Sequence, residues 1–395
     1  MRIMLPTLIY PPCASRQASS YFAYDAFVWT LYMPVKQPIS QPISQPISQP
    51  ISQPISQPAD RPTLISLNNY LPGLLVSIYS TKKQHEMYSH IKYVVLVTHD
   101  VPEEALQLIS KFADHIWLVR YITRPIHLVK NSKFAQRADI DLWINSSYTK
   151  FNALALPYKK IVLLDCDTVC LGKLTPLLLM DTPAACYANI NHVPFGNIAN
   201  HHVTPGSACM YPTHGEKIPR ETIIKSLTQN GTVFSGSVLV LSPNLTEFNE
   251  LLALLDRVIF ANDTCLSKPD EQCLATFYMH KKIEITNIEA IYNAVQYSHA
   301  YLHRARPVLL HYPGINKPWL SAITDMTIKR WHEIAAICAV VTQTNALKEY
   351  TMCKNLTLKL HQEALTMQFS IAANAKVQLE QIPNESEFDW MDFLN

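Results

Sequence analysis

The chain has 395 residues, of which 48% are hydrophobic and 16% charged, a composition that can fill a core and excludes a wholly disordered protein. Because 33 Lys and Arg residues nearly balance 31 Asp and Glu residues, the sequence predicts no electrostatic binding of nucleic acid. The nine Cys residues include no CxxC pair, which argues against a zinc module and favours a reducing compartment over a disulfide scaffold.

The first segment, residues 1–36, is expected to be poorly ordered. Its apolar start is broken by Pro6 and ends at Pro11, unlike a signal peptide. The aromatic stretch at residues 21–35 contains Asp25 and is too short to cross a membrane. Because no uncharged apolar stretch of about 18 residues occurs in the chain, the sequence predicts no membrane span.

Residues 37–56 are exact copies of Gln-Pro-Ile-Ser, followed by a degenerate copy at residues 57–60. Proline at every fourth position removes a backbone donor and is incompatible with a helix or a central strand. We therefore expect residues 37–60 to form an extended linker without chemistry of its own.

Residues 61–324 are predicted to form an α/β domain with a mostly parallel central sheet, because strand and helix patterns alternate along them. Apolar runs without alternation are typical of strands covered on both faces. Such strands are predicted at residues 91–98, 161–164, 237–241 and 308–310. A helix is predicted over residues 102–112.

The C-terminal residues 325–395 are predicted to be a helical extension with an acidic tail. Helical patterns without strand signals occupy residues 327–341 and 345–372. The last residues, 385–395, are acidic and aromatic and are expected to fray.

Two carboxylates, Asp165 and Asp167, follow the predicted strand at residues 161–164. Ligands of open α/β sheets bind beyond the carboxyl ends of the strands. Carboxylates this close together need a cation, and a hard divalent metal could bridge them to a diphosphate. A second pair, Asp139 and Asp141, follows no apolar strand and is interpreted as a solvated loop or helix start.

A second polar group follows the predicted strand at residues 308–310. His311 ends that strand, and its imidazole is a suitable third ligand for manganese. Lys317 could neutralise a phosphate as a point charge, and Gly314 would let the backbone approach that phosphate closely.

Together, these two groups resemble the signature of glycosyltransferase family 8, the glycogenin-like group. That family pairs D-x-D after a strand with a downstream H-x-x-G-x-x-K-P-W, and the second motif is complete at residues 311–319. The resemblance extends from about Thr63 to Trp319. It implies a GT-A fold that binds a nucleotide sugar together with Mn²⁺.

The resemblance also implies roles for individual residues. The metal ligands would be Asp165, Asp167 and His311. Lys317 would contact the diphosphate, and Gly314 would let the backbone come close to the same group.

The nucleotide and sugar contacts of the family match five further positions. Ser66 and Tyr70 fall where the family binds uridine, with the tyrosine ring stacking on the base. Lys150 resembles a family lysine upstream of the D-x-D. Asp270 resembles the aspartate of the family's D-Q segment near the transferred sugar, and Asn293 belongs to a Y-N pair that lines the sugar pocket.

The chain departs from the family pattern at three places. The family's F-N-S-G-V reads F-S-G-S-V at residues 234–238, Leu67 replaces a polar residue, and Glu271 directly follows Asp270. These differences affect the identity of the sugar and the level of activity, and they leave the metal ligands untouched.

The function implied by the resemblance is retaining transfer of a hexosyl or related group from a UDP-sugar to a hydroxyl, with Mn²⁺. The acceptor would be a carbohydrate, a polyol or a protein, and Asp270 would orient the sugar or the acceptor. Self-glycosylation is open at Tyr292, Tyr297 or Tyr301, although none of them matches the family's acceptor.

Two other classes of function stay open. One is a catalytically weak or inactive interaction protein on a degenerate transferase fold, and the other is a nucleotidyltransferase, which also uses D-x-D with a divalent metal. A homodimer is one assembly to test. The expected compartment is the cytoplasm, with the Golgi or secretory lumen as the alternative.

Overall fold

The computed structural model shows an α/β core that is built from part of the chain. The described residues are 24–31, 70–124, 127–128, 144–187, 214–230, 233–256, 264–265, 268–295, 307–313, 317–320, 326–344 and 347. The repeats at residues 37–60 and the pair Asp139 and Asp141 lie outside them, as does the predicted helix at residues 345–372 except for residue 347.

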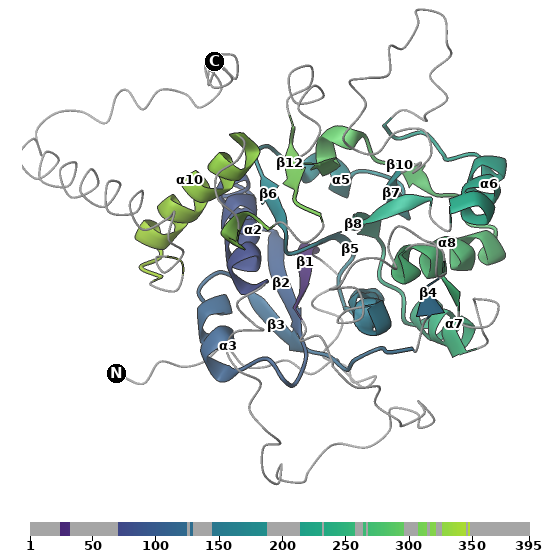
Figure 1. Ribbon diagram of the computed structural model, residues 1–395, viewed down its shortest axis with the longest axis horizontal. Coiled ribbons are helices and arrows are strands. Elements are labelled where there is room, and N and C mark those ends of the chain that lie inside the picture. Colours follow the sequence, from purple (N-terminus) through teal and green to yellow (C-terminus); the bar gives the residue numbers. More distant parts are fainter. Residues whose placement is uncertain are drawn as a thin grey trace, which may run out of the picture.

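A seven-stranded sheet forms the centre of the molecule (Figure 1). Its strands in spatial order are β10 (Thr286–Asn287), β7 (Ala184–Tyr187), β8 (Phe234–Leu241), β5 (Lys160–Leu164), β1 (Asp25–Leu31), β2 (Ile91–Val97) and β3 (His115–Leu118). Pairing is parallel except that β8 runs antiparallel to both of its neighbours. The predicted class, an α/β fold with a mostly parallel central sheet, is confirmed.

Strand β1 corrects the prediction for the N-terminal segment, because residues 25–31 are not poorly ordered. This strand lies between β5 and β2, in parallel register with both, and the side chains of Phe27 and Trp29 are fully buried. A continuous apolar run explains the placement, since a central parallel strand is covered on both faces. The repeat-containing residues 32–69 therefore connect two elements of one domain.

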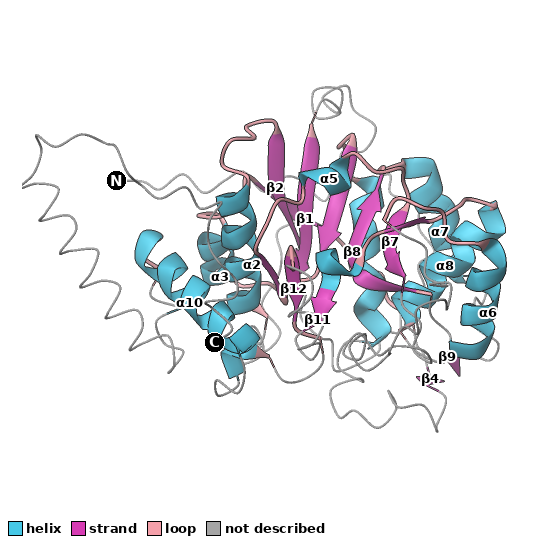
Figure 2. Cartoon of the chain, turned by 90° about the horizontal axis from the view of Figure 1, so that it is seen from above, coloured by secondary structure: helices cyan, strands magenta, loops and turns pink. Residues whose placement is uncertain are grey.

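Helices cover both faces of the sheet, as Figure 2 shows. Alternate residues of each strand enter two separate apolar clusters: Phe27 and Val95 enter one, while Val28 and Val94 enter the other. The first cluster includes α2 (Leu71–Gln84), α3 (Glu103–Ile109), α5 (Thr175–Leu178) and α10 (Met326–Val341). The second includes η2 (Ile144–Ala155), α6 (Arg220–Asn230), α7 (Leu245–Asp256) and α8 (Pro269–Lys281).

A small sheet beside the main one brings distant parts of the chain together. Its strands in order are β11 (Ala294–Val295), β12 (Leu309–His311) and β6 (Thr168–Cys170). Because β12 runs antiparallel to β6, His311 lies opposite Thr168. The short elements η4 (Ala290–Asn293) and η5 (Pro318–Leu320) flank it, and β4 (His127–Leu128) pairs with β9 (Thr264–Cys265) elsewhere.

The four strands predicted from apolar runs are present as β2, β5, β8 and β12, each shifted or extended by a few residues at most. The predicted helix at residues 102–112 is shorter. Pro102 is the N-cap with extended backbone, and the helix α3 ends at Ile109. The predicted helix at residues 327–341 is confirmed as α10. Within the described part of the chain, no helix is long and apolar enough to cross a membrane.

Candidate functional site

Three ligand-type side chains meet at the ends of β5 and β12. Asp165 and Asp167 follow β5, and His311 is the last residue of β12. One ligand atom from each residue lies within 4.8 Å of those of the other two. The loop after β5 is held by the backbone, because Asp165 N–H donates to the Ser237 carbonyl at 3.0 Å and Tyr312 N–H donates to the Asp167 carbonyl at 2.9 Å.

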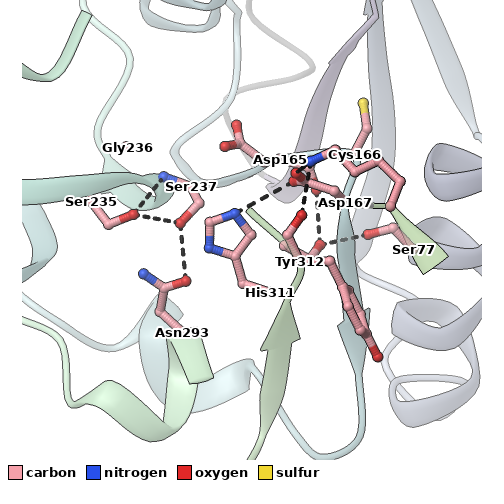
Figure 3. A network of polar contacts seen from close by, with 12 residues as sticks. Ser77, Asp165, Cys166, Asp167, Ser235, Gly236, Ser237, Asn293, His311 and Tyr312 are labelled. Carbon is pink, nitrogen blue, oxygen red and sulfur yellow. Dashed lines mark hydrogen bonds and ion pairs between the residues drawn. The ribbon is translucent and has the colours of Figure 1, made fainter. Parts of the chain in front are cut away.

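Asp167 is the most strongly ionised member of this group. Its side chain is buried, and Lys317 Nζ donates to its Oδ2. His311 Nε2 lies 3.6 Å from Asp167 Oδ1, and Figure 3 shows this pair. Burial alone would raise the pKa of Asp167, but the charge of Lys317 and its hydrogen bond outweigh burial and hold that pKa below its usual value.

Asp165 has the opposite tendency. Desolvation raises the pKa of its carboxyl, the neighbouring Asp167 and Asp270 raise it further, and Lys150 opposes them. Burial lowers the pKa of His311 to about 3, with help from nearby lysines, so its imidazole is neutral at ordinary pH. A neutral imidazole is the form that binds a metal.

The donor set fits a divalent cation. Two carboxylates and one neutral imidazole are oxygen and nitrogen ligands of the kind that manganese accepts. The Nδ1 atom of His311 is also buried without a hydrogen-bond partner. The three residues therefore meet the chemical requirements for Mn²⁺ that the sequence predicted.

Lys150 joins this group to Asp270. From η2, its Nζ lies 3.1 Å from Asp165 Oδ1 and 3.0 Å from Asp270 Oδ2, and it donates to the Gly236 carbonyl at 3.2 Å. The side chains of Lys150 and Asp270 are 12% and 7% exposed, so this contact is largely shielded from solvent. The structure thus brings Lys150 and Asp270 to the same site as the metal-ligand group.

Helix α8 supplies Asp270 from its first turn. The helix starts with Pro269, whose missing N–H costs nothing at that position, and two acidic residues follow where the helix dipole favours them. The next residue, Glu271, accepts from the Gly236 N–H at 2.6 Å and from Lys268 Nζ at 2.8 Å. This departure from the family's D-Q segment therefore ties α8 to β8.

Gly236 makes room for both acidic residues. A Cβ on Gly236 would lie 3.1 Å from Glu271 Cγ and 3.2 Å from Asp270 Oδ2, tighter than ordinary contact. A side chain at this position would push against the acidic end of α8. Steric contact with Asp270 and Glu271 thus explains why a glycine occupies position 236 in this chain.

Asn293 lies in η4, buried behind the ligand group. Its Oδ1 accepts from Ser237 Oγ at 3.0 Å, and Ser237 Oγ shares a 2.7 Å hydrogen bond with Ser235 Oγ (Figure 3). Asn293 has no exposed surface. Ser237 therefore holds the predicted sugar-pocket asparagine against β8, and Ser235 fixes the hydroxyl of Ser237.

Tyr70 lies directly before α2, and its ring is close to the ammonium of Lys317. The Lys317 ammonium is 5.3 Å from the centre of the Tyr70 ring, a cation–π distance, and the ring meets Trp319 edge to face at 6.3 Å. Tyr70 is therefore near the predicted diphosphate contact. Ser66 and Gly314, the other predicted nucleotide contacts, lie outside the described residues.

Two residues of the site were missed in the sequence. Lys268 pairs with Glu271, and its position next to Pro269 and two acidic residues was the available signal. Thr30 is the second-last residue of the overlooked β1, and its carbonyl accepts from Cys166 Sγ at 3.2 Å, which ties the D-x-D loop to that strand. Burial raises the pKa of the Cys166 thiol, so Cys166 is a neutral spacer.

Comparison with known proteins identifies one family. The model of glycosyl transferase family 8 matches residues 63–322. The uncharacterized protein R707 of Acanthamoeba polyphaga mimivirus is 25% identical over 273 residues, which cover 68% of this chain and 84% of that protein. Glycogenin of Neurospora crassa is 25% identical over 275 residues, which cover 67% of this chain but only 32% of glycogenin.

The chain also has limited similarity to solved structures, at low sequence identity. The galactosyltransferase LgtC in complex with donor and acceptor sugar analogs has a TM-score of 0.44 at 14% identity, covering 78% of this chain and 94% of LgtC. The glycosyltransferase GlyE of Streptococcus pneumoniae has a TM-score of 0.42 at 15% identity, covering 83% of this chain and 64% of GlyE.

Proposed function

The chain belongs to glycosyl transferase family 8, and we propose that it transfers a sugar from a UDP-sugar to a hydroxyl, with retention of configuration and with Mn²⁺. One observation carries the proposal. Asp165, Asp167 and His311 bring their ligand atoms within 4.8 Å of one another, and Lys317 lies against Asp167. A divalent cation beside a lysine is suited to a diphosphate.

Breaking the bond between the sugar and UDP leaves negative charge on the diphosphate. Mn²⁺ held by Asp165, Asp167 and His311 would supply Lewis-acid stabilisation of that charge. Lys317 adds a second positive charge from a buried position, where an electrostatic contact is stronger than in water. Tyr70, 5.3 Å from the ammonium, offers a ring face to the base.

Asp270 is proposed to orient the transferred sugar or the acceptor hydroxyl. Its carboxylate is buried, and Lys150 holds it together with Asp165. Fixing a hydrogen-bond acceptor in this way reduces the reorganisation needed during reaction. The leaving phosphate then takes the acceptor proton on the same face of the sugar, so no separate enzyme base is required. The acceptor would be a carbohydrate, a polyol or a protein.

Release of UDP from a panel of UDP-sugars tests this proposal. The assay compares Mn²⁺ with EDTA, and wild type with Asp167→Asn and the control Asp181→Asn, whose side chain is 81% exposed in a surface ion pair. We expect release from one donor that requires Mn²⁺, is lost in Asp167→Asn and is retained in Asp181→Asn.

Other outcomes of this assay select among the alternatives. An absence of both UDP release and metal-dependent UDP binding would replace the enzyme with an interaction protein on this fold. Binding without release would indicate that the acceptor is missing from the assay. Release of UMP-containing products by cleavage between the phosphates would indicate a nucleotidyltransferase.

A further inference from the structure

Helix α10 lies outside the segment that matches the family, yet it packs beside the site. The family match ends at residue 322, and α10 spans Met326–Val341. It packs against α2 and η5, and Figure 1 shows it alongside α2 at one edge of the molecule. Its inward residues, among them Trp331, Ala335 and Cys338, belong to the same apolar cluster as α2.

Tyr312 connects this helix to two residues of the site. Its ring is fully buried, and its Oη donates to the Thr327 carbonyl in the first turn of α10 at 2.7 Å. Its backbone N–H donates to the Asp167 carbonyl at 2.9 Å, and its own carbonyl accepts from Lys317 Nζ at 2.8 Å. One residue thus contacts α10, the D-x-D loop and the lysine.

An aromatic path makes a second connection. Trp331 of α10 is fully buried and lies against Trp319 with ring centres 5.5 Å apart. Trp319 in turn contacts the ring of Tyr70 in an edge-to-face arrangement. The approach is close, because a Cβ on Gly73 of α2 would lie 2.6 Å from Trp319 Cζ3.

We propose that α10 is a positioning element of the site and that Tyr312 and Trp331 are its positioning residues. Tyr312 fixes the carbonyl that holds the Lys317 ammonium against Asp167. Trp331 fixes Trp319 and, through it, the ring of Tyr70. The predicted effect on UDP binding rests on the proposed function. The positioning of Tyr312, Lys317 and Trp319 by α10 does not.

The test compares two Tyr→Phe variants. Tyr312→Phe keeps the ring and removes the hydroxyl that reaches Thr327. Tyr158→Phe is the matched control, because Tyr158 is also fully buried. Its hydroxyl lies 2.5 Å from Nδ1 of His115, the first residue of β3. Both variants lose the hydrogen bond of a buried tyrosine hydroxyl, so losses in Tm of the same order are expected.

Only Tyr312→Phe should alter the site. Titration calorimetry with UDP is expected to show binding weakened about two- to tenfold, the effect of one hydrogen bond, in Tyr312→Phe alone. Hydrogen exchange of the ligand-free protein should be faster at the amides of Tyr312 and Leu320, whose partners are Asp167 and Lys317. Trp331→Phe should change UDP binding in the same direction.

Unchanged UDP affinity and unchanged exchange at Tyr312 and Leu320 in Tyr312→Phe would overturn the inference. So would equal losses in Tyr312→Phe and Tyr158→Phe, because a general loss of stability would then account for them. If the wild type binds no UDP, the proposed function fails, and the exchange comparison alone decides whether α10 positions these residues.

Discussion

The ammonium of Lys150 lies 3.0 Å from one carboxylate oxygen of Asp270, and neither side chain is more than 12% exposed. The same ammonium is 3.1 Å from Asp165. One lysine therefore keeps two acidic side chains of the site together. Such a buried arrangement is costly to break, because removal of the shared cation leaves charges without compensation.

Lys150→Met should destabilise the metal-free protein by about 3 kcal/mol, the cost of breaking a buried ion pair. Added Mn²⁺ should raise its Tm more than it raises that of the wild type, because a bound cation compensates carboxylates that have lost the lysine. Thermal unfolding in EDTA and in Mn²⁺ measures both effects.

Lys281→Met provides the control for this change. Lys281 pairs with Glu250 on the surface, with side chains 34% and 43% exposed, so its removal should cost well under about 1 kcal/mol. Its response to Mn²⁺ should equal that of the wild type. A metal response in Lys150→Met no larger than in Lys281→Met would contradict the predicted charge compensation.

Asp270→Asn should reduce kcat by about 100-fold while UDP affinity changes little, because a positioned carboxylate is lost near the reacting centre. The substitution preserves side-chain size, and the metal-ligand group retains all its members. Steady-state kinetics and UDP calorimetry together separate the two effects. Full turnover in Asp270→Asn would exclude the proposed role of Asp270.

His85 should make the stability depend on pH. Its imidazole is buried, its Nδ1–H donates to the Thr81 carbonyl at 2.7 Å, and its Nε2 accepts from the Leu174 N–H at 2.8 Å. Burial lowers the pKa of His85 below its ordinary value of 6.5. The stabilising effect of the neutral ring is therefore complete above pH 6.5 and is lost as the pH falls below it.

The free energy of unfolding should thus decrease by up to about 1.4 kcal/mol per pH unit for this one proton. Denaturant titrations between neutral pH and about pH 5 measure the slope, and His85→Gln should flatten it because glutamine does not titrate. Identical slopes in the wild type and His85→Gln would show that other groups produce the pH dependence.

Gly73→Ala should destabilise the protein by about 1–3 kcal/mol, the usual cost of overpacking. The new Cβ would lie 2.6 Å from a carbon of the Trp319 ring and 2.7 Å from the Cys166 carbonyl. UDP affinity should fall as well, because Trp319 contacts Tyr70. Gly172→Ala is the control, since its Cβ would meet Val308 at an ordinary 3.4 Å.

Two deletions should distinguish the contribution of β1 to folding from that of the repeats. A chain that starts at Thr63, where the family match begins, lacks the interior strand β1 and should not fold, because β5 and β2 would lose their shared neighbour. Removal of residues 37–56 about halves the connection between β1 and α2, so it should leave the fold intact and gain about 0.6 kcal/mol at most. Circular dichroism melting compares them, and a folded chain without β1 would refute the assigned importance of that strand.

Much of the site could be predicted because its residues directly follow apolar strands. Asp165, Asp167 and His311 each follow or end such a run, and strand ends that meet at one edge bring their side chains together. Asp270 and Lys150 were assigned through the family resemblance, and the structure brings them within contact of each other. Contacts such as Tyr312 to Thr327 could not be predicted, because they depend on how a helix packs against a strand.

The N-terminal strand β1 could not be placed in the sheet by considering each segment of the sequence separately. Residues 25–31 carry the continuous apolar run of a buried parallel strand. It lies within residues 1–36, which the sequence predicts to be poorly ordered, where the aromatic stretch at residues 21–35 is weighed only as a membrane span. Distance along the chain does not exclude pairing, since closing a longer connection costs little additional free energy.

By itself, the sequence determined the α/β class and the family, and it pointed to Asp165, Asp167 and His311 as a candidate metal-ligand group, because apolar patterning and short motifs depend on neighbouring residues. The tertiary structure alone decided that β1 is an interior strand between β5 and β2, that Lys150 joins Asp165 to Asp270, and that α10 reaches the site through Tyr312. Those relationships arise from strand register and side-chain packing between remote segments, which depend on the whole fold rather than on any local pattern.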